Sequence, residues 1–209
     1  MLTFLQYLVE EQEASGGSLH VFDIDETLFH TDARIHVRDK HGNIVRSLTN
    51  QEYNTHVLPP EHHYDYSEFK EADRFERTSH PVHKMIAKVK AIQKQIANKP
   101  QHRIIFATAR ADFDDRDKFL DVFRSRGIDI DKIHVHRVGN DPGPESPAEK
   151  KVKVVRDYIN RDGYRKVRMY DDSTANLRAF NKMKREYPDV QFTSHHVQPS
   201  GTTRVYKEA

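Results

Sequence analysis

Apolar residues recur along this chain in runs that switch between strand length and helical spacing. The first clear run, residues 19–22, is continuous and ends directly at Asp23. From Val82 to Ile96 the apolar positions fall on one helical face. Later runs predict strands at 104–106, 133–138, 167–170 and 190–193, and helices around 119–123, from Pro147 and from Thr174. This alternation predicts an α/β fold with a parallel sheet and helices on both of its faces.

The residues that follow the first strand interrupt this alternation. Segments 33–39 and 43–48 are strand-like, and the loop between them offers Gly42 for a left-handed position, so we expect a hairpin. Residues 50–80 are rich in His, Tyr, Glu and Pro and show no clear period. The whole stretch, 31–80, is therefore expected to form a small inserted lobe, or cap.

The two ends of the chain carry weaker patterns. Apolar residues at helical spacing near the start predict a short amphipathic segment followed by a Gly-rich linker, and the polar end predicts a flexible tail. The expected division is a segment and linker at 1–18, a core at 19–30 and 81–197, the inserted lobe at 31–80, and the tail at 198–209. A chain of 209 residues has room for one such core with an insertion.

Composition narrows the classes of function. Hydrophobic residues make up 36% and charged residues 32%, and with 11 Phe and 9 Tyr the chain is expected to fold. A formal net charge of +2 neither requires nor excludes a nucleic-acid partner. The lack of cysteine excludes disulfides, thiolate nucleophiles and Cys-ligated zinc, and the 14 His show no closed zinc-ligand pattern. No run reaches the roughly 18 apolar residues of a membrane span and the start lacks the basic residues of a signal peptide, so we expect a soluble, cytoplasmic protein.

Chemically versatile residues follow the predicted strands, at the ends where functional groups collect in an open parallel sheet. They are Asp23 to Thr27, Thr108 to Arg110, the residues before Pro147, and Asp171 with Asp172. Asp23 and Asp25 are alternate residues that point the same way in extended backbone. Two carboxylates so close are costly unless a cation lies between them or one is protonated. This pattern favours Mg²⁺ binding and proton transfer.

Four short motifs, in this order, resemble those of the haloacid-dehalogenase superfamily. They are Asp23-Ile24-Asp25-Glu26-Thr27, the strand that ends in Thr108, a lysine near a helix start, and Asp171-Asp172 with Asn176 nearby. The resemblance runs from about residue 21 to 177. It implies a three-layer Rossmann-like core with a cap after the first strand. It also implies Mg²⁺-dependent hydrolysis of a phosphomonoester through an aspartyl-phosphate intermediate.

The resemblance also implies roles for individual acidic residues. Asp23 would be the nucleophile, Asp25 the general acid and base, and Thr27 a support for the loop. Mg²⁺ would be bound by the carboxylates of Asp23 and Asp172 and by the backbone carbonyl of Asp25, with Asp171 as a secondary metal residue. The superfamily often has a second acid where this chain has an Asn, so the metal shell is expected to be less negative.

The remaining site predictions concern the phosphate group. The resemblance implies that Thr108 hydrogen-bonds a phosphoryl oxygen, and Arg110 is expected either to contact substrate or to form a structural ion pair. Lys150, Lys151 and Lys153 compete for the role of the phosphate-binding lysine. Lys151 is preferred because it shares a helical face with apolar residues four and seven positions later. The helix that carries these lysines begins in a Ser-Pro-Ala-Glu capping box, which fixes its start.

Substrate and partner predictions remain broader. Residues 106–180 are similar to the phosphatase half of polynucleotide kinase-phosphatases, although the phosphate loop of a kinase half is absent. The expected substrate is a phosphorylated nucleotide or a nucleic-acid 3′-phosphate end. Aromatic residues of the lobe either stack on its base or form the lobe's own core. A phosphoprotein or a small metabolite is the alternative, because the first motif also resembles phosphoprotein phosphatases and some acid phosphatases.

An alternative hypothesis, from another class of function, starts from the N-terminal segment. It is similar to the leader segments of some tailed-phage proteins, which would place the chain in a host cytoplasm. The corresponding function is a non-catalytic particle or interaction protein that keeps the fold. Every catalytic position of the four motifs is filled, and this favours an enzyme over a non-catalytic protein.

Overall fold

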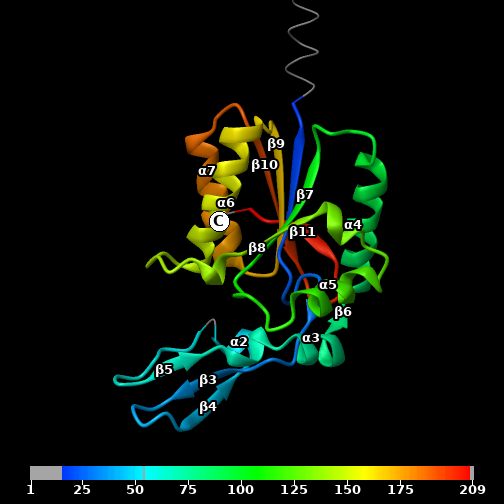
Figure 1. Ribbon diagram of the computed structural model, residues 1–209. Helices are drawn as coiled ribbons and strands as arrows, with labels where there is room; N and C mark the ends of the chain where they lie inside the picture. Colours follow the sequence, from blue (N-terminus) through cyan, green and yellow to red (C-terminus); the bar gives the residue numbers. More distant parts are fainter. Residues whose placement is uncertain (1–15, 54, 208–209) are drawn as a thin grey trace, which may run out of the picture.

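The computed structural model describes residues 16–53 and 55–207. Its centre is a six-stranded sheet in the order β11-β10-β9-β1-β7-β8 (Figure 1). The strands are β1 (Ser18–Phe22), β7 (Arg103–Thr108), β8 (His134–Arg137), β9 (Lys166–Asp171), β10 (Gln191–Val197) and β11 (Thr203–Val205). The first five run parallel, and β11 is antiparallel to β10. The predicted α/β fold with a mostly parallel sheet is confirmed.

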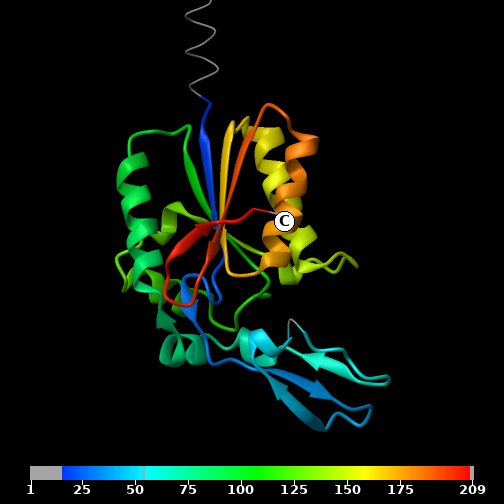
Figure 2. The same cartoon turned by 180° about the vertical axis from the view of Figure 1, so that it is seen from behind.

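Helices cover both faces of this sheet (Figures 1 and 2). On one side lie α4 (His83–Ile96) and α5 (Arg116–Arg124), and on the other α6 (Pro147–Asp162) and α7 (Thr174–Glu186). Two short turns, η2 (Ile130–Lys132) and η3 (Val138–Asn140), flank β8. Successive residues of the buried central strand β1 serve opposite cores: Phe22 packs on the α4 side, and Leu19 and Val21 on the α6 side. This layering is compatible with a Rossmann-like fold.

The inserted lobe leaves the sheet after β1 and returns before α4. Its stem is the antiparallel pair β2 (Phe29–His30) and β6 (His80–Pro81). Its outer part contains β3 (Ile35–Arg38), β4 (Ile44–Leu48), α2 (Asn50–Tyr53), β5 (His63–Asp65), η1 (Ser67–Lys70) and α3 (Ala72–Thr78), with the strands in the order β4-β3-β5. The lobe lies beyond the carboxyl ends of the parallel strands (Figure 1). It therefore sits near the edge of the sheet that Asp23 and Asp171 occupy.

The lobe has a small core of its own, which explains why its sequence lacked a clear period. The predicted hairpin is present as β3 and β4, with Gly42 at a φ of 85°. Residues from the aperiodic part, including Tyr53 and Tyr64, pack around Val37 and Leu48. These contacts join short elements that are far apart in sequence, so no single helix or strand displays the pattern.

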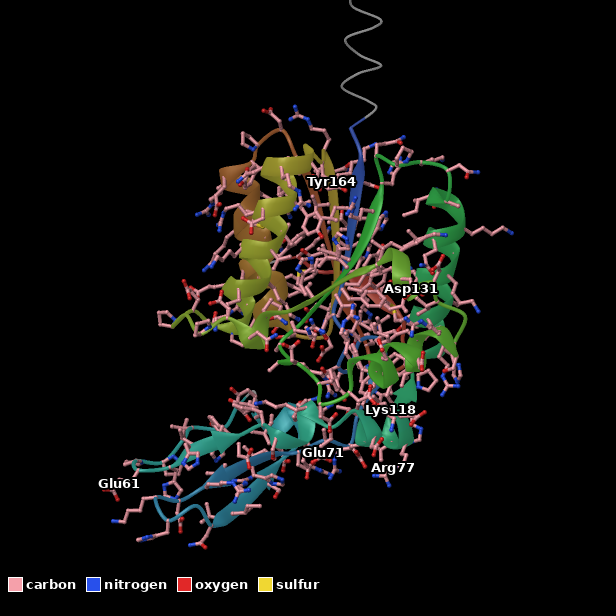
Figure 3. The ribbon with its side chains drawn as sticks, viewed as in Figure 1. Glu61, Glu71, Arg77, Lys118, Asp131 and Tyr164 are labelled. Carbon is pink, nitrogen blue, oxygen red and sulfur yellow. The ribbon has the colours of Figure 1, made fainter. Side chains whose placement is uncertain are left out.

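Polar contacts tie the lobe to the core domain. The Ala72 amide donates to the Asp114 carboxylate (2.8 Å), and the Asp114 amide donates to the Lys70 carbonyl (3.0 Å). Lys118 of α5 forms an ion pair with Asp73 of α3, and Figure 3 shows Lys118 at this junction. The root of the lobe is thereby fixed against α5.

The structure differs from the sequence prediction at both ends of the described chain. Residues 203–205 form β11 rather than part of a flexible tail, after a turn in which Gly201 has a φ of 74°. Gly17 belongs to no free linker, because its carbonyl accepts hydrogen bonds from the Arg165 and Lys166 amides (3.1 and 3.3 Å). A Cβ at Gly17 would lie 1.8 Å from the Gln101 carbonyl oxygen, so this close approach requires glycine.

The predicted amphipathic segment at residues 1–15 lies outside the described residues. Among the helices that the structure does describe, none is both long and apolar enough to cross a membrane.

Candidate active site

A tight turn at the carboxyl end of β1 presents the two aspartates of the first motif. The Asp23 amide still donates to the Tyr170 carbonyl of β9 (3.0 Å), so Asp23 continues the central strand. The chain then folds back, with the Leu28 and Phe29 amides both donating to the Ile24 carbonyl (2.8 and 3.0 Å). Glu26 adopts a left-handed φ of 58°, which is uncommon for a residue with a side chain and often marks a functional turn.

The Lys151 ammonium lies between two carboxylates at the centre of the site. Its Nζ donates to Asp23 Oδ1 at 2.6 Å and to Asp171 Oδ2 at 2.9 Å, and all three side chains are buried. Burial lowers the pKa of this lysine, but Asp171 and Asp23 outweigh burial and raise it above its usual value. Lys151 is therefore a fixed positive charge. Of the described residues, none donates a hydrogen bond to the other oxygen of Asp23, Oδ2.

Asp23, Asp171 and Asp172 form a group of acids that can hold a metal ion. Each offers one oxygen, and these oxygens lie within 4.8 Å of one another. Burial raises the pKa of Asp172 to about 7, with Asp171 adding repulsion. Burial also raises the pKa of Asp23, with Asp171 and Asp172 adding to it and Lys151 opposing it. The single Lys151 ammonium thus does not balance the negative charge of the three carboxylates. Three hard oxygen donors suit a divalent cation such as Mg²⁺.

Hydrogen bonds hold the carboxylates of this group in place. The Thr27 hydroxyl accepts from the Asp172 amide (3.2 Å) and donates to the Asp172 carboxylate (3.5 Å). Asp171 accepts a hydrogen bond from the Ser173 amide (2.9 Å). The side-chain nitrogen of Asn176 also donates to both carboxylate oxygens of Asp171, at 2.9 and 3.0 Å. Asn176 is therefore a partner of Asp171, so its amide orients the acid cluster.

Asp25 contacts a different cation from the one that holds Asp23. Arg110 binds it in bidentate fashion, with Nη2 to Oδ1 at 2.6 Å and Nε to Oδ2 at 2.9 Å. The Thr108 hydroxyl donates to Asp25 Oδ2 at 3.4 Å and accepts from the Arg110 amide at 3.1 Å. Asp25 is the more exposed partner, at 16% of its side chain against 2% for Arg110. The two aspartates of one motif are thus held by separate cations.

Arg110 is itself fixed by the lobe and by aromatic rings. Its Nη1 donates to the Phe69 carbonyl of the lobe at 2.8 Å. The guanidinium lies 4.8, 4.9 and 5.2 Å from the ring centres of Phe69, Phe75 and Phe113. Of the two roles expected for Arg110, the structure shows the ion pair. It also links the lobe to Asp25, a contact that no sequence pattern predicted.

The three competing lysines separate clearly. Lys151 reaches Asp23, whereas Lys150 donates to the Asp141 carbonyl (2.6 Å) and Lys153 pairs with the Asp141 carboxylate (3.3 Å). Residues 155 and 158 of the same helical face are buried with Lys151, as expected. The capping box at the start of α6 is present.

The predicted site residues therefore lie together. The Thr108 hydroxyl, however, already donates a hydrogen bond to Asp25. Two neighbouring contacts were not predicted from the sequence. Glu26 pairs with His30 at 2.8 Å, and the His196 ring lies 2.9 Å from the Asp172 carbonyl. His196 comes from β10, and no motif marks it.

A scan against protein-family models and searches of curated proteins and of solved structures found no match to this chain. The function is therefore inferred from the geometry of the site.

The acid cluster yields a prediction about metal binding that does not depend on activity. Mg²⁺ should raise the melting temperature of the wild-type chain, because a ligand at 100 times its dissociation constant stabilises by about 2.7 kcal/mol. Asp172→Asn should melt above the wild type in EDTA, because one crowded negative charge is gone, and should lose most of the response to Mg²⁺. Differential scanning calorimetry measures both effects.

The control is Asp189→Asn, which removes an exposed carboxylate outside the site. It should respond to Mg²⁺ as the wild type does. An undiminished Mg²⁺ response in Asp172→Asn would contradict the metal site.

Proposed function

We propose that this chain is a Mg²⁺-dependent phosphohydrolase of the haloacid-dehalogenase type in which Asp23 takes up the phosphoryl group. The observation that carries the proposal is the arrangement around Asp23: Lys151 holds one carboxylate oxygen, and no described residue donates to the other. A carboxylate nucleophile divides hydrolysis into two displacements, formation of an acyl phosphate and its cleavage by water. Oδ2 is the atom available for the first displacement.

The acid cluster supports a role for a divalent cation beside this nucleophile. Asp23, Asp171 and Asp172 would hold it through their carboxylates, with the backbone carbonyl of Asp25 as a further donor. When bound, the cation would supply the positive charge that lets an anionic nucleophile approach a phosphate dianion. Lys151 contributes fixed positive charge at the same place, and as a preorganised cation it favours the charge that develops on the phosphoryl oxygens.

Asp25 is our candidate for proton transfer, and Arg110 would be its positioning residue. Asp25 would protonate the leaving oxygen in the first displacement and take a proton from the attacking water in the second. In the observed arrangement both of its oxygens accept from Arg110. Proton donation therefore requires Asp25 to free one oxygen lone pair when substrate binds, by releasing either Thr108 or one contact with Arg110. Thr108 can then turn its hydroxyl from Asp25 to a phosphoryl oxygen, which is its proposed role.

A phosphorylated nucleotide or a nucleic-acid 3′-phosphate end is our first candidate substrate, and its support is the similarity to polynucleotide phosphatases. Stacking by the lobe gives little further support, because the lobe's tyrosines contact one another. The Tyr53 and Tyr66 hydroxyls lie 2.8 Å apart, and the ring of Tyr64 meets both rings, at 4.9 and 6.1 Å. Phosphoproteins and small phosphorylated metabolites remain the alternative substrates, and a non-catalytic interaction protein is the alternative class.

Removal of the nucleophile gives the first prediction on activity. With a generic aryl phosphate, the wild type should turn over in Mg²⁺ and stop in EDTA. Asp23→Asn should lose at least about 10³-fold in kcat while keeping the wild-type circular dichroism spectrum, because an amide cannot form the acyl phosphate. Phosphatase activity of Asp23→Asn equal to that of the wild type would exclude the assignment. Lack of activity in the wild type with every substrate would favour the non-catalytic class.

A second prediction separates the two steps assigned to Asp25. An aryl phosphate has a good leaving group that needs little protonation, so Asp25→Asn should still form the acyl phosphate but cleave it slowly. General acid–base catalysis typically contributes about 10²–10⁴-fold, and the loss should fall mainly on the second displacement. Rapid-quench measurements should show a burst of about one phenol per protein followed by a slow phase. The absence of a burst, with both steps equally slow, would remove the assigned role.

A third prediction concerns the substrate. Initial rates should be compared at equal concentration for oligonucleotides with 3′ or 5′ phosphates, mononucleotides, phosphopeptides and sugar phosphates. We expect kcat/KM for a nucleic-acid 3′ phosphate to exceed that for a sugar phosphate by at least about tenfold, because binding to remote parts of a substrate contributes to its transition state. Equal rates for all nucleic-acid forms and sugar phosphates would eliminate the nucleic-acid candidate.

A further inference from the structure

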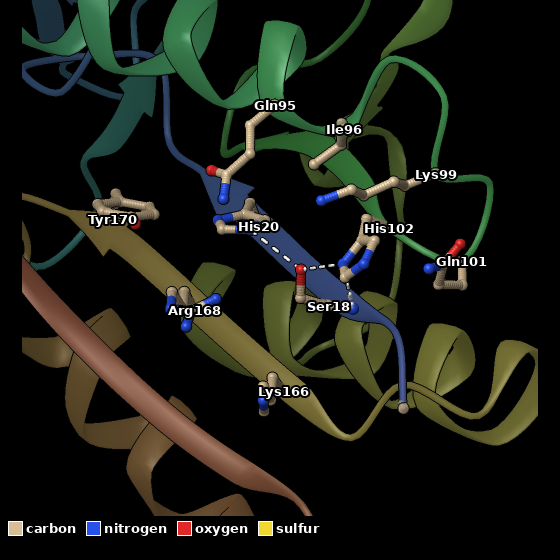
Figure 4. Close-up of a pocket in the computed structure, with 11 residues that line it drawn as sticks. Ser18, His20, Gln95, Ile96, Lys99, Gln101, His102, Lys166, Arg168 and Tyr170 are labelled. Carbon is tan, nitrogen blue, oxygen red and sulfur yellow. Dashed lines mark hydrogen bonds between the residues drawn. The ribbon is translucent and has the colours of Figure 1, made fainter. Parts of the chain in front are cut away.

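A cavity lies on the α4 side of the sheet, at the opposite end of the strands from the acid cluster. Ser18 and Lys166 are the first residues of β1 and β9, whereas Asp23 follows the end of β1 and Asp171 ends β9. The cavity has a volume of about 450 Å³, within the range of small-molecule sites. Figure 4 shows its wall, built from β1, β9, the end of α4 and the loop that follows α4.

The charge around this cavity has one sign. Lys99, Lys166 and Arg168 line it, and none of its described lining residues is an acid. Within the described chain these three cations form no ion pair. The sequence as a whole is nearly balanced, with 34 basic and 32 acidic residues, so this local excess is a property of the cavity. Unpaired cations around a concave site attract an anion.

Hydrogen bonds at the base of the cavity fix where the protons lie. The Ser18 amide donates to His102 Nδ1 at 3.1 Å, so this nitrogen carries no hydrogen. With Nδ1 unprotonated, the Ser18 hydroxyl, 2.7 Å from this nitrogen, is a second donor to the same lone pair. Its oxygen is then the acceptor for His20 Nε2 at 3.2 Å. His20 thus carries its hydrogen on Nε2.

The other nitrogen of His20 has no partner among the residues that the structure describes. His20 is 7% exposed, and its Nδ1 is buried and forms no hydrogen bond with this part of the chain. Burial, with Arg168, His102 and His195 adding to it, lowers the pKa of His20 to about 4, so the ring is neutral at pH 7. Nδ1 is then an unused acceptor in a ring that lines a cavity with three cations, and because this atom is buried, a ligand reaches it only when a neighbouring side chain shifts. A ligand that satisfies both features is an anion that also carries a hydrogen-bond donor.

The Tyr170 ring in the wall of the cavity offers no free face on which a base could stack. The Tyr170 ring is flanked by Phe22 at 4.3 Å and His195 at 4.6 Å, with both partners nearly parallel to it. Its two faces are therefore already used. The ligand is recognised through charge and hydrogen bonding, which favours a small inorganic anion over a nucleotide.

We propose that this cavity binds inorganic phosphate as hydrogenphosphate, with Lys99, Lys166 and Arg168 neutralising its charge and His20 Nδ1 accepting its P–OH hydrogen. Hydrogenphosphate keeps one hydrogen at neutral and mildly alkaline pH. Sulfate has none under these conditions, and the dianion of a simple phosphate monoester has none above its second pKa of about 6. The site should therefore discriminate among three anions of similar size and charge. This site is independent of the proposed hydrolytic function.

The test uses the full chain in EDTA at pH 8, titrated with inorganic phosphate, sulfate or methyl phosphate. Binding is followed by calorimetry and by the side-chain ¹⁵N NMR signals of His20 and His102. We expect phosphate to shift the His20 signals and to bind at least tenfold more tightly than sulfate or methyl phosphate. Arg168→Gln should weaken phosphate binding at least tenfold, whereas Arg185→Gln, an exposed change on α7, should leave it unchanged.

Two further variants make the outcome decisive. Lys99→Gln changes an exposed side chain and should weaken phosphate binding even if Arg168→Gln fails to fold. His20→Phe keeps a buried ring without either nitrogen and should lose the preference for phosphate over sulfate. Sulfate or methyl phosphate bound as tightly as phosphate by the wild type would overturn the proposal. So would phosphate binding that leaves the His20 signals unmoved, as expected if the anion binds elsewhere on the protein.

Discussion

The buried ammonium of Lys151 is the constraint on which the candidate site depends. A lone charge in this position would be strongly unfavourable, and removal of one member of a buried ion pair typically costs about 3 to 5 kcal/mol. Lys151 contacts the Asp23 and Asp171 carboxylates, so it joins the ends of β1 and β9 to α6. The capping box at Ser146 fixes the start of α6, which sets where Lys151 reaches the sheet. The start of α6 and the ends of β1 and β9 together thus set the positions of the site residues.

A second cation resolves the crowding within the first motif. Asp23 and Asp25 are separated by one residue, yet Lys151 holds the first and Arg110 the second. The left-handed turn at Glu26 sends the chain directly into the stem of the lobe, and Arg110 also binds the lobe through the Phe69 carbonyl. The lobe and the proposed acid–base residue are therefore mechanically linked. A movement of the lobe on substrate binding is a physical route by which Asp25 could be released for proton transfer.

The sequence allowed much of this arrangement to be predicted, where the signal was local. The apolar run before Asp23 marked the strand end, and the helical face of Lys151 distinguished it from Lys150 and Lys153. The pairing of Arg110 with Asp25 joins residues 85 positions apart, and only the folded chain brings them together. Short elements of the lobe pack through contacts between distant segments, so no period appears. β11 was missed because it is a short edge strand with mostly exposed side chains, held by backbone hydrogen bonds.

In the proposed reaction, a phosphoryl group passes through Asp23. The most direct measurement is a single-turnover reaction of Asp25→Asn with an aryl phosphate in Mg²⁺, quenched in acid and analysed by peptide mapping with mass spectrometry. We expect one phosphoryl group on the peptide that contains residue 23, localised to Asp23 and absent when Mg²⁺ is replaced by EDTA. A phosphoryl group on another residue, or product formation with no phosphorylated peptide at any reaction time, would contradict it.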